Sequence, residues 1–165
     1  MPRRPLFVLD ENFPEPVLRA ALSQWAPEID LRPLKNVEPR LLGDQEDWRV
    51  ILGAKQAGAE GLVTCDDSML HLPEVIAVIE QTAFTVISCQ ETGHDGIVAS
   101  GLLIAHIPRI ARRHDPHRPQ VWQLSAPERQ PRRIGDLKEE IRRRSGRDVD
   151  AYKLSQQMLE SPLFP

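Results

Sequence analysis

The stretch LFVLDEN at residues 6–12 places four apolar residues directly before Asp10, Glu11 and Asn12. An uninterrupted apolar run of this length is typical of a strand buried on both faces, as in a parallel sheet. The following Phe13-Pro14-Glu15-Pro16 favours the start of a helix. Asp10 is therefore expected in a strand-to-helix turn at the rim of the sheet, where open α/β folds bind their ligands.

The rest of the first 125 residues alternates between short apolar segments and segments with helical spacing. This alternation predicts an α/β domain with a mainly parallel sheet. We expect strands at 29–32, 61–65, 84–88 and 121–124, helices at 18–25, 44–57, 73–79 and 94–106, a loop over 33–43 and a break or kink at Pro108.

The chain after residue 125 differs in composition from the part before it. Residues 126–133 are rich in proline and arginine, as in a linker, and two short, highly charged helices are expected at 134–144 and 149–159. We therefore predict two parts: an α/β domain over 1–125 and a basic linker with a helical extension over 126–165.

Length and composition exclude several classes of protein. The 165 residues are 41% hydrophobic and 27% charged, which suits a globular domain with a core. No apolar run is long enough to span a bilayer, and the segment after Arg4 is too short for a signal peptide. Cys65 and Cys89 form no CxxC motif, so we expect a reduced, cytoplasmic setting. Neither a phosphate-binding glycine motif nor a Ser/His or Cys/His nucleophile spacing is present.

Charge is distributed unevenly along the chain. Residues 1–107 carry 8 Lys or Arg and 16 Asp or Glu, whereas residues 108–165 carry 13 and 8. An arginine-rich flank can bind phosphate, and Arg109, Arg112 and Arg113 are our candidates for RNA contacts. For the arginines of residues 138–144, the competing interpretation is a solvated helix face in which they pair with Glu139 and Glu140.

Three acids are expected to meet at one edge of the sheet. Asp10 follows the first strand, Asp66 follows the strand at 61–65, and Asp47 lies in the first turn of the second helix. Carboxylates from three segments make an oxygen-only site suited to Mg²⁺ or Mn²⁺, which can activate water and stabilise charge on a phosphodiester. Each acid taken singly could instead cap a helix or complement its dipole.

Three blocks of sequence resemble the PIN-like family that contains toxin-type nucleases of toxin–antitoxin pairs. Leu9-Asp10-Glu11-Asn12 is similar to its LDEN opening, residues 47–54 (DWRVILGA) to its acid-led helix, and residues 62–66 (LVTCD) to its VTxD strand end. The order and approximate intervals of the blocks match, and the resemblance covers roughly residues 5–110.

The resemblance implies a compact three-layer α/β/α PIN fold and metal-dependent cleavage of RNA. Asp10, Asp47 and Asp66 would be catalytic and would bind the metal, Mg²⁺ or Mn²⁺, and we add Asp67 to the metal ligands. The family pattern continues with an acid and an aromatic residue at the positions where this chain has Ser68 and Met69. Supporting roles are assigned to Asn12, Thr64 and Asp95.

Two functional hypotheses follow. The first is a metal-dependent endoribonuclease, a phosphodiester hydrolase that acts as the toxin of a toxin–antitoxin pair. Its expected partners are RNA and an antitoxin protein. We also expect self-association and no association with a membrane. The second is a non-catalytic PIN-like module that binds RNA or protein, which the Ser68 departure favours. A signalling receiver domain ranks third, because it needs a Lys after its last strand and residues 56–137 contain none.

Overall fold

The chain folds, in this computed structural model, into two compact units, residues 1–126 and 127–165. The first unit holds the sheet, and the second is helical. The residues that the structure describes are 3–11, 13–43, 45–66, 68–92, 95–125 and 133–157.

The first unit is built on a five-stranded sheet in which every neighbouring pair of strands is parallel. Its strand order is β2-β1-β3-β4-β5. The α/β class with a parallel sheet is therefore confirmed. The strands are β1 (Leu6–Leu9), β2 (Asp30–Pro33), β3 (Gly61–Thr64), β4 (Thr85–Cys89) and β5 (Gln120–Leu124).

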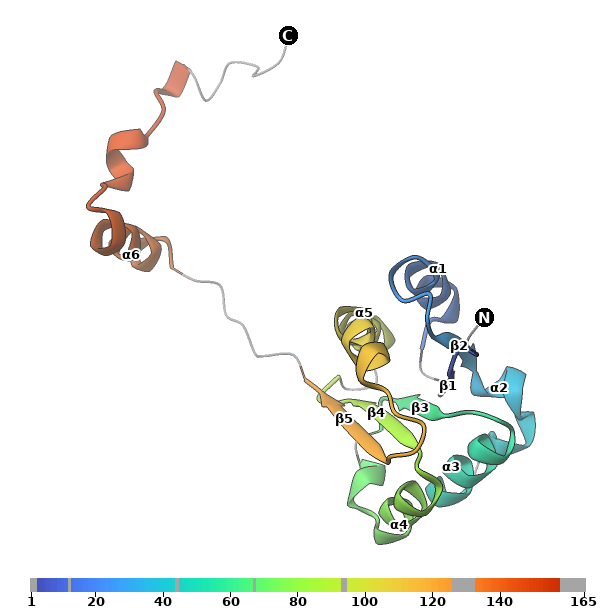
Figure 1. The fold of residues 1–165 in the computed structure, drawn as a ribbon. Helices are drawn as coiled ribbons and strands as arrows, with labels where there is room; N and C mark the ends of the chain where they lie inside the picture. The colour runs from blue at the N-terminus through green and yellow to red at the C-terminus, as the bar shows by residue number, and fades with distance from the viewer. Residues whose placement is uncertain are drawn as a thin grey trace. The chain divides into compact units, whose positions relative to one another are not determined.

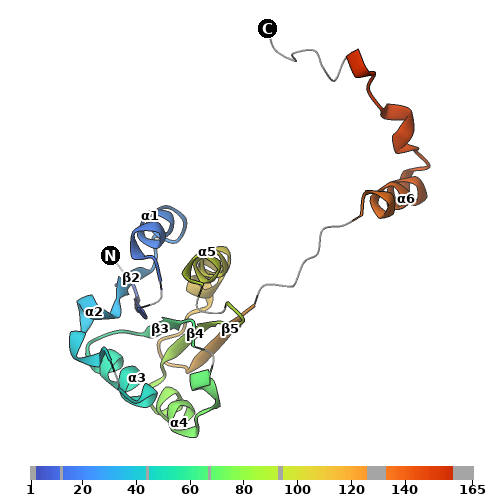
Figure 2. The ribbon, with the colours of Figure 1, turned by 180° about the vertical axis from the view of Figure 1, so that it is seen from behind.

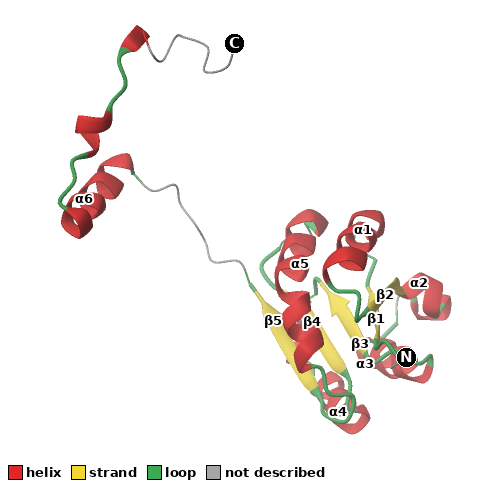
Figure 3. Ribbon diagram, turned by 45° about the horizontal axis from the view of Figure 1, so that its top comes forward, coloured by secondary structure: helices red, strands yellow, loops and turns green. Residues whose placement is uncertain are grey.

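Helices cover both faces of the sheet and complete three α/β/α layers (Figure 1). On one face α1 (Glu15–Trp25) and α5 (Gly96–Arg113) lie side by side (Figure 3). On the other face lie α3 (Asp47–Gln56) and α4 (Pro73–Thr82), which are seen from behind in Figure 2. Among the described helices, none is long and apolar enough to cross a membrane.

Each face of the sheet has its own hydrophobic core, and β1 contributes to both. Phe7 and Leu9 pack with the residues of α1 and α5, whereas Val8 packs with those of α3 and α4. All three side chains are at most 2% exposed. Burial on both faces explains why β1 is continuously apolar instead of alternating.

The predicted loop over 33–43 contains two short helical turns, α2 (Leu34–Val37) and the 3-10 turn η1 (Pro39–Leu41). Proline is well suited to the first position of a helical turn, so Pro39 starts η1 instead of preventing it. The Glu38 side chain accepts a hydrogen bond from the backbone N–H of Arg40, which fixes this turn. The buried Leu34 anchors α2 to the core.

Two expectations about helices differ from the structure. α5 does not break at Pro108, because Ile107 and Ile110 on either side are fully buried and their packing outweighs the lost backbone hydrogen bond. Trp25, expected on the buried stripe of α1, is 65% exposed, since α1 ends there and Ala26 supplies the buried contact.

The second unit consists of α6 (Ile134–Ser145) and the 3-10 turn η3 (Val149–Tyr152). Where a helix was expected over 149–159, the structure has this turn and helical residues at 156 and 157, and the end of that prediction lies outside the described residues. Lys138 Nζ lies 2.7 Å from Asp150 Oδ1 and joins α6 to η3. This bond and a second one from Lys153 lower the pKa of Asp150 to about 2.

Candidate functional site

The strand order reverses between β1 and β3. The chain leaves β1 for β2 on one side and later returns to β3 on the other. In an open parallel sheet, the carboxyl ends of the strands at such a reversal border a crevice that binds ligands. Here this edge holds a cleft of about 400 Å³, lined by Asp10, Glu11, Leu34, Leu41, Leu42, Gly43, Asp47, Val50, Leu62, Thr64, Asp66 and Met69.

The cleft contains the three acids that were predicted from the sequence to meet. Asp10 comes from the end of β1, Asp66 from the end of β3, and Asp47 is the first residue of α3. Thr64, the last residue of β3, also lines the cleft. The structure thus brings three carboxylates to one cleft, although Asp10 and Asp47 are 37 positions apart in the sequence and Asp47 and Asp66 are 19 positions apart.

Asp10 is fixed to β3 by two hydrogen bonds. Its backbone N–H donates to the Val63 carbonyl at 3.0 Å, which continues the β1–β3 ladder by one residue. Its Oδ2 accepts from the backbone N–H of Cys65 at 3.0 Å. The carboxylate is therefore held at the strand ends, half-buried at the rim of the cleft.

Asp66 is held by its own turn. Ser68 donates from its backbone N–H at 2.9 Å and from its hydroxyl at 2.6 Å to Asp66 Oδ1. The backbone N–H of Asp66 donates to Thr64 Oγ1 at 2.9 Å. Ser68, the residue that departs from the family pattern, thus supplies two hydrogen-bond donors to Asp66.

Asp47 experiences an unfavourable electrostatic environment. Burial raises its pKa, and the negative charge of Asp66 raises it further. A neighbouring negative charge makes the ionised form of a carboxylate more costly, and a cation bound between the two groups relieves this cost. The cleft therefore has an excess of negative charge that a divalent metal ion would offset.

The supporting candidates are placed differently. Asp95 caps α5, accepting from the backbone N–H groups of Ile97 at 2.9 Å and Val98 at 3.2 Å, and does not line the cleft. The capping interpretation therefore accounts for Asp95. Asn12 and Asp67 lie outside the described residues.

The donor chemistry of the cleft can be compared with the needs of Mg²⁺ or Mn²⁺. Half-buried carboxylates and a hydroxyl are the hard oxygen ligands that these ions prefer. In the present side-chain arrangement, the described residues contain no group of three or more His, Cys, Asp or Glu side chains that could hold a metal ion. The residue types thus fit the ion, and binding requires the carboxylates to draw closer together.

The two cysteines lie beside this site without the properties of a nucleophile. Burial raises the pKa of Cys65 to about 11, and the carboxylate of Asp10 contributes. Burial, Cys65 and Asp10 raise the pKa of Cys89 to about 12. Both thiols therefore stay protonated near neutral pH, which agrees with the absence of a recognisable Cys/His motif.

The three predicted RNA-binding arginines lie near the amino ends of the strands, opposite the edge of the sheet that holds the acidic cleft. α5 starts after the carboxyl end of β4 and ends before the amino end of β5. Gln120 Nε2 donates to the Arg113 carbonyl at 2.8 Å, which places Arg113 beside the start of β5. Arg109 and Arg112 are in the same half of α5, and all three arginines are exposed. The structure does not bring them to the acidic cleft.

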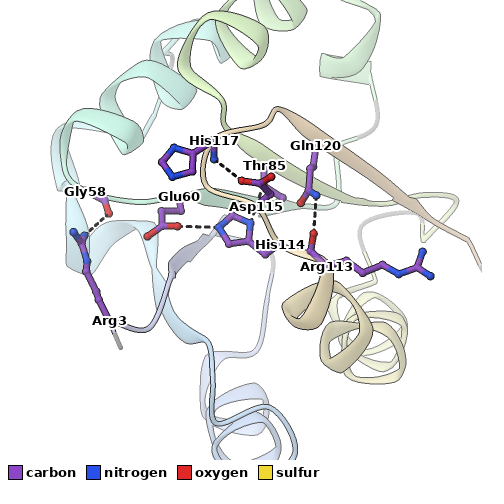
Figure 4. Close-up of polar contacts among 9 residues, drawn as sticks. All are labelled: Arg3, Gly58, Glu60, Thr85, Arg113, His114, Asp115, His117 and Gln120. Atoms are coloured by element: carbon purple, nitrogen blue, oxygen red, sulfur yellow. Dashed lines mark hydrogen bonds and ion pairs between the residues drawn. The ribbon is translucent and has the colours of Figure 1, made fainter. Parts of the chain in front are cut away.

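A buried histidine near the amino ends of the strands was not predicted from the sequence (Figure 4). His114 Nε2 lies 2.8 Å from Glu60 Oε2, and its Nδ1 lies 3.3 Å from Thr85 Oγ1. Its ring also packs edge-on against Phe7 at 5.1 Å. Because Glu60 is 54 residues away in sequence, no local pattern indicates this contact. The network ties the end of α5 to the starts of β1, β3 and β4.

Comparison with protein-family models, curated proteins and solved structures finds no significant match for this chain. Its functional interpretation therefore depends on the cleft itself and on the three sequence blocks that contribute to it.

Proposed function

We propose that this protein is a divalent-metal-dependent ribonuclease that cleaves phosphodiester bonds in the cleft at the carboxyl ends of β1 and β3. The observation that carries the proposal is the meeting of Asp10, Asp47 and Asp66 from three segments in one cleft at the reversal of strand order. Caps alone would not require the three acids to share a cleft.

Asp10, Asp47 and Asp66 would hold the Mg²⁺ or Mn²⁺ ion. When bound, such an ion supplies positive charge for the phosphate oxygens and makes water a stronger acid. The raised pKa of Asp47 supports this assignment, because burial and the negative charge of Asp66 both disfavour its ionised form, and a bound cation would offset both effects.

The residues around the acids have positioning roles in this proposal. The N–H of Cys65 orients Asp10, and the two donors of Ser68 orient Asp66. Such fixed orientation reduces the rearrangement that a reacting phosphate requires of the site. The apolar part of the cleft wall is formed by Leu34, Leu41, Leu42, Val50, Leu62 and Met69.

RNA as the substrate and a role as a toxin with a cognate antitoxin are parts of the proposal that rest on the resemblance to PIN-like nucleases. The parallel order 2-1-3-4-5 also occurs in flavodoxin-like folds, including signalling receivers. A receiver would use a Lys after β5, and Leu124 is followed there by Ser125. We therefore prefer the nuclease.

The proposal is tested by incubating the full chain with a labelled single-stranded RNA and Mn²⁺. Cleavage is expected, with loss on addition of EDTA and a decrease of at least about 100-fold in the Asp10→Asn variant. Asp95→Asn is the matched control, because Asn also caps helices and residue 95 lies outside the cleft. Equal cleavage by Asp10→Asn would contradict the site. RNA binding without cleavage, retained in Asp10→Asn, would support the non-catalytic module.

A further inference from the structure

A second hollow adjoins the acidic cleft. It has a volume of about 340 Å³ and lies where β1 and β2 end, beside the turn into α1 and the start of α2. Asp10, Glu11, Leu34 and Leu42 line both the cleft and the hollow. A molecule in the hollow would therefore border directly on one held by the three acids.

Five of the nine residues that line the hollow are apolar, and the other four are charged. The apolar residues are Leu9, Phe13, Pro33, Leu34 and Leu42. Leu9, Phe13 and Leu34 are each less than 9% exposed, so these walls are fixed by the core. A volume of this size is at the lower end of the range of small-molecule sites. It suits one flat ring system and excludes a paired duplex.

Two charged side chains of opposite sign line the hollow and are free to meet a ligand. Lys35 at the start of α2 is exposed and makes no hydrogen bond or ion pair with any described residue. The same holds for Glu11, within the described part of the chain. Glu15, the remaining acid besides Asp10, already pairs with Arg19.

We propose that the hollow binds one unpaired guanine nucleotide of the RNA, next to the phosphodiester held in the acidic cleft. The base would lie between the apolar walls, as unstacked bases do on apolar and aromatic side chains in proteins that bind single-stranded RNA. Lys35 would contact the nucleotide's phosphate, and Glu11 would accept hydrogen bonds from the base. The inference rests on the proposed nuclease function and extends it to a base preference.

Guanine follows from the chemistry of Glu11. A carboxylate is an acceptor with two oxygens and pairs best with two adjacent N–H donors. The Watson–Crick edge of guanine presents two such donors, N1–H and the N2 amino group. Adenine and cytosine each present one amino group beside a ring nitrogen acceptor, which a carboxylate repels. Uracil presents a single N–H between two carbonyls.

The test is a calorimetric titration of the full chain with GMP, CMP and guanosine, each in the presence of EDTA. GMP is expected to bind at least about tenfold more tightly than CMP, and Glu11→Gln to weaken GMP about tenfold. Lys35→Met is expected to weaken GMP about threefold to tenfold while leaving guanosine unchanged, because guanosine lacks the phosphate. Glu80→Gln and Lys55→Met, which lie outside the hollow, are matched controls.

Equal binding of GMP and CMP, or an unchanged GMP affinity in Glu11→Gln, would overturn the proposal. Because the titration contains no metal, its result is independent of catalysis. GMP binding by a chain that does not cleave RNA would support the hollow as a guanine nucleotide site and contradict the nuclease. Cleavage without GMP selectivity would retain the nuclease and overturn the hollow.

Discussion

Asp47 shows a conflict between local and tertiary electrostatics. The first turn of a helix favours a negative charge, because the helix dipole is positive there. Burial and the neighbouring Asp66 nevertheless raise the pKa of Asp47. A carboxylate kept in an unfavourable place is characteristic of functional sites, where stability is given up for binding or catalysis.

Asp47→Asn is therefore expected to stabilise the metal-free protein at pH 7, by up to about 1 kcal/mol for this half-exposed group. A raised folded-state pKa gives stability that is present at low pH and lost as pH rises through that pKa. The gain should accordingly vanish as pH falls below about 4, the ordinary Asp value. Urea unfolding at pH 7 and at acidic pH measures it, with Asp95→Asn as control. A gain that grows on acidification would contradict the account.

Ser68 provides a second test at this scale. Its hydroxyl donates to Asp66 Oδ1 at 2.6 Å. Ser68→Ala removes this donor, and we expect about tenfold weaker Mn²⁺ binding, as is typical of lost outer-shell partners. Ser68→Thr keeps the hydroxyl and serves as the control. An Ala variant with the affinity of the wild type would show that Ser68 does not position Asp66.

At the level of elements, β3 depends on a glycine at its start. A Cβ on Gly61 would lie 1.9 Å from Phe7 Cδ1 and 2.9 Å from the Thr85 carbonyl oxygen. Phe7 and Thr85 are both fully buried, so neither neighbour can move easily. The close approach of three adjacent strands therefore requires a residue without a side chain.

Gly61→Ala is expected to destabilise the fold by about 1–3 kcal/mol, because it overpacks the sheet. Gly101→Ala gives the opposite expectation. Gly101 is an exposed residue of α5 with no atom within 4 Å of an added Cβ, so alanine should stabilise α5 by about 0.5–1 kcal/mol. Thermal unfolding of both variants measures the effects. An unchanged or raised stability of Gly61→Ala would contradict the packing described for β3.

The sheet could be predicted from sequence because buried strands such as β1 and β3 are short continuous apolar runs with acids at their ends. The cleft followed from these runs, since parallel strands bring their carboxyl ends to one edge. The hollow could not be predicted, because its walls come from the end of β1, α2 and residue 42, in a segment expected to be a loop. The His114–Glu60 pair joins positions 54 residues apart, which leaves no periodic signal.

At the level of the whole chain, the two units differ in the interactions that stabilise each of them internally. Both hydrophobic cores consist of residues between Leu6 and Leu124. In the second unit, every described residue is exposed or half-buried, and ion pairs such as Arg144–Glu140 at 2.9 Å line α6. Exposed pairs of this kind contribute little to stability. The arginines of α6 thus agree with the solvated-face interpretation.

A chain ending at Ser125 is expected to unfold within about 2 °C of the full chain, because both hydrophobic cores consist of residues between Leu6 and Leu124. Its Mn²⁺ affinity should be unchanged for the same reason. Thermal unfolding and calorimetry of the two proteins make the comparison. A large loss of stability would show that residues after 125 contribute to the fold of the first unit.

The central claim is that Asp10, Asp47 and Asp66 form one cation site. Calorimetric titration of Mn²⁺ into the metal-free full chain, with Asp66→Asn and Asp95→Asn alongside, tests it most directly. The account predicts one binding event in the wild type and in Asp95→Asn, and its loss in Asp66→Asn. Absence of Mn²⁺ binding to the wild type, or equal affinity in all three proteins, would contradict the claim.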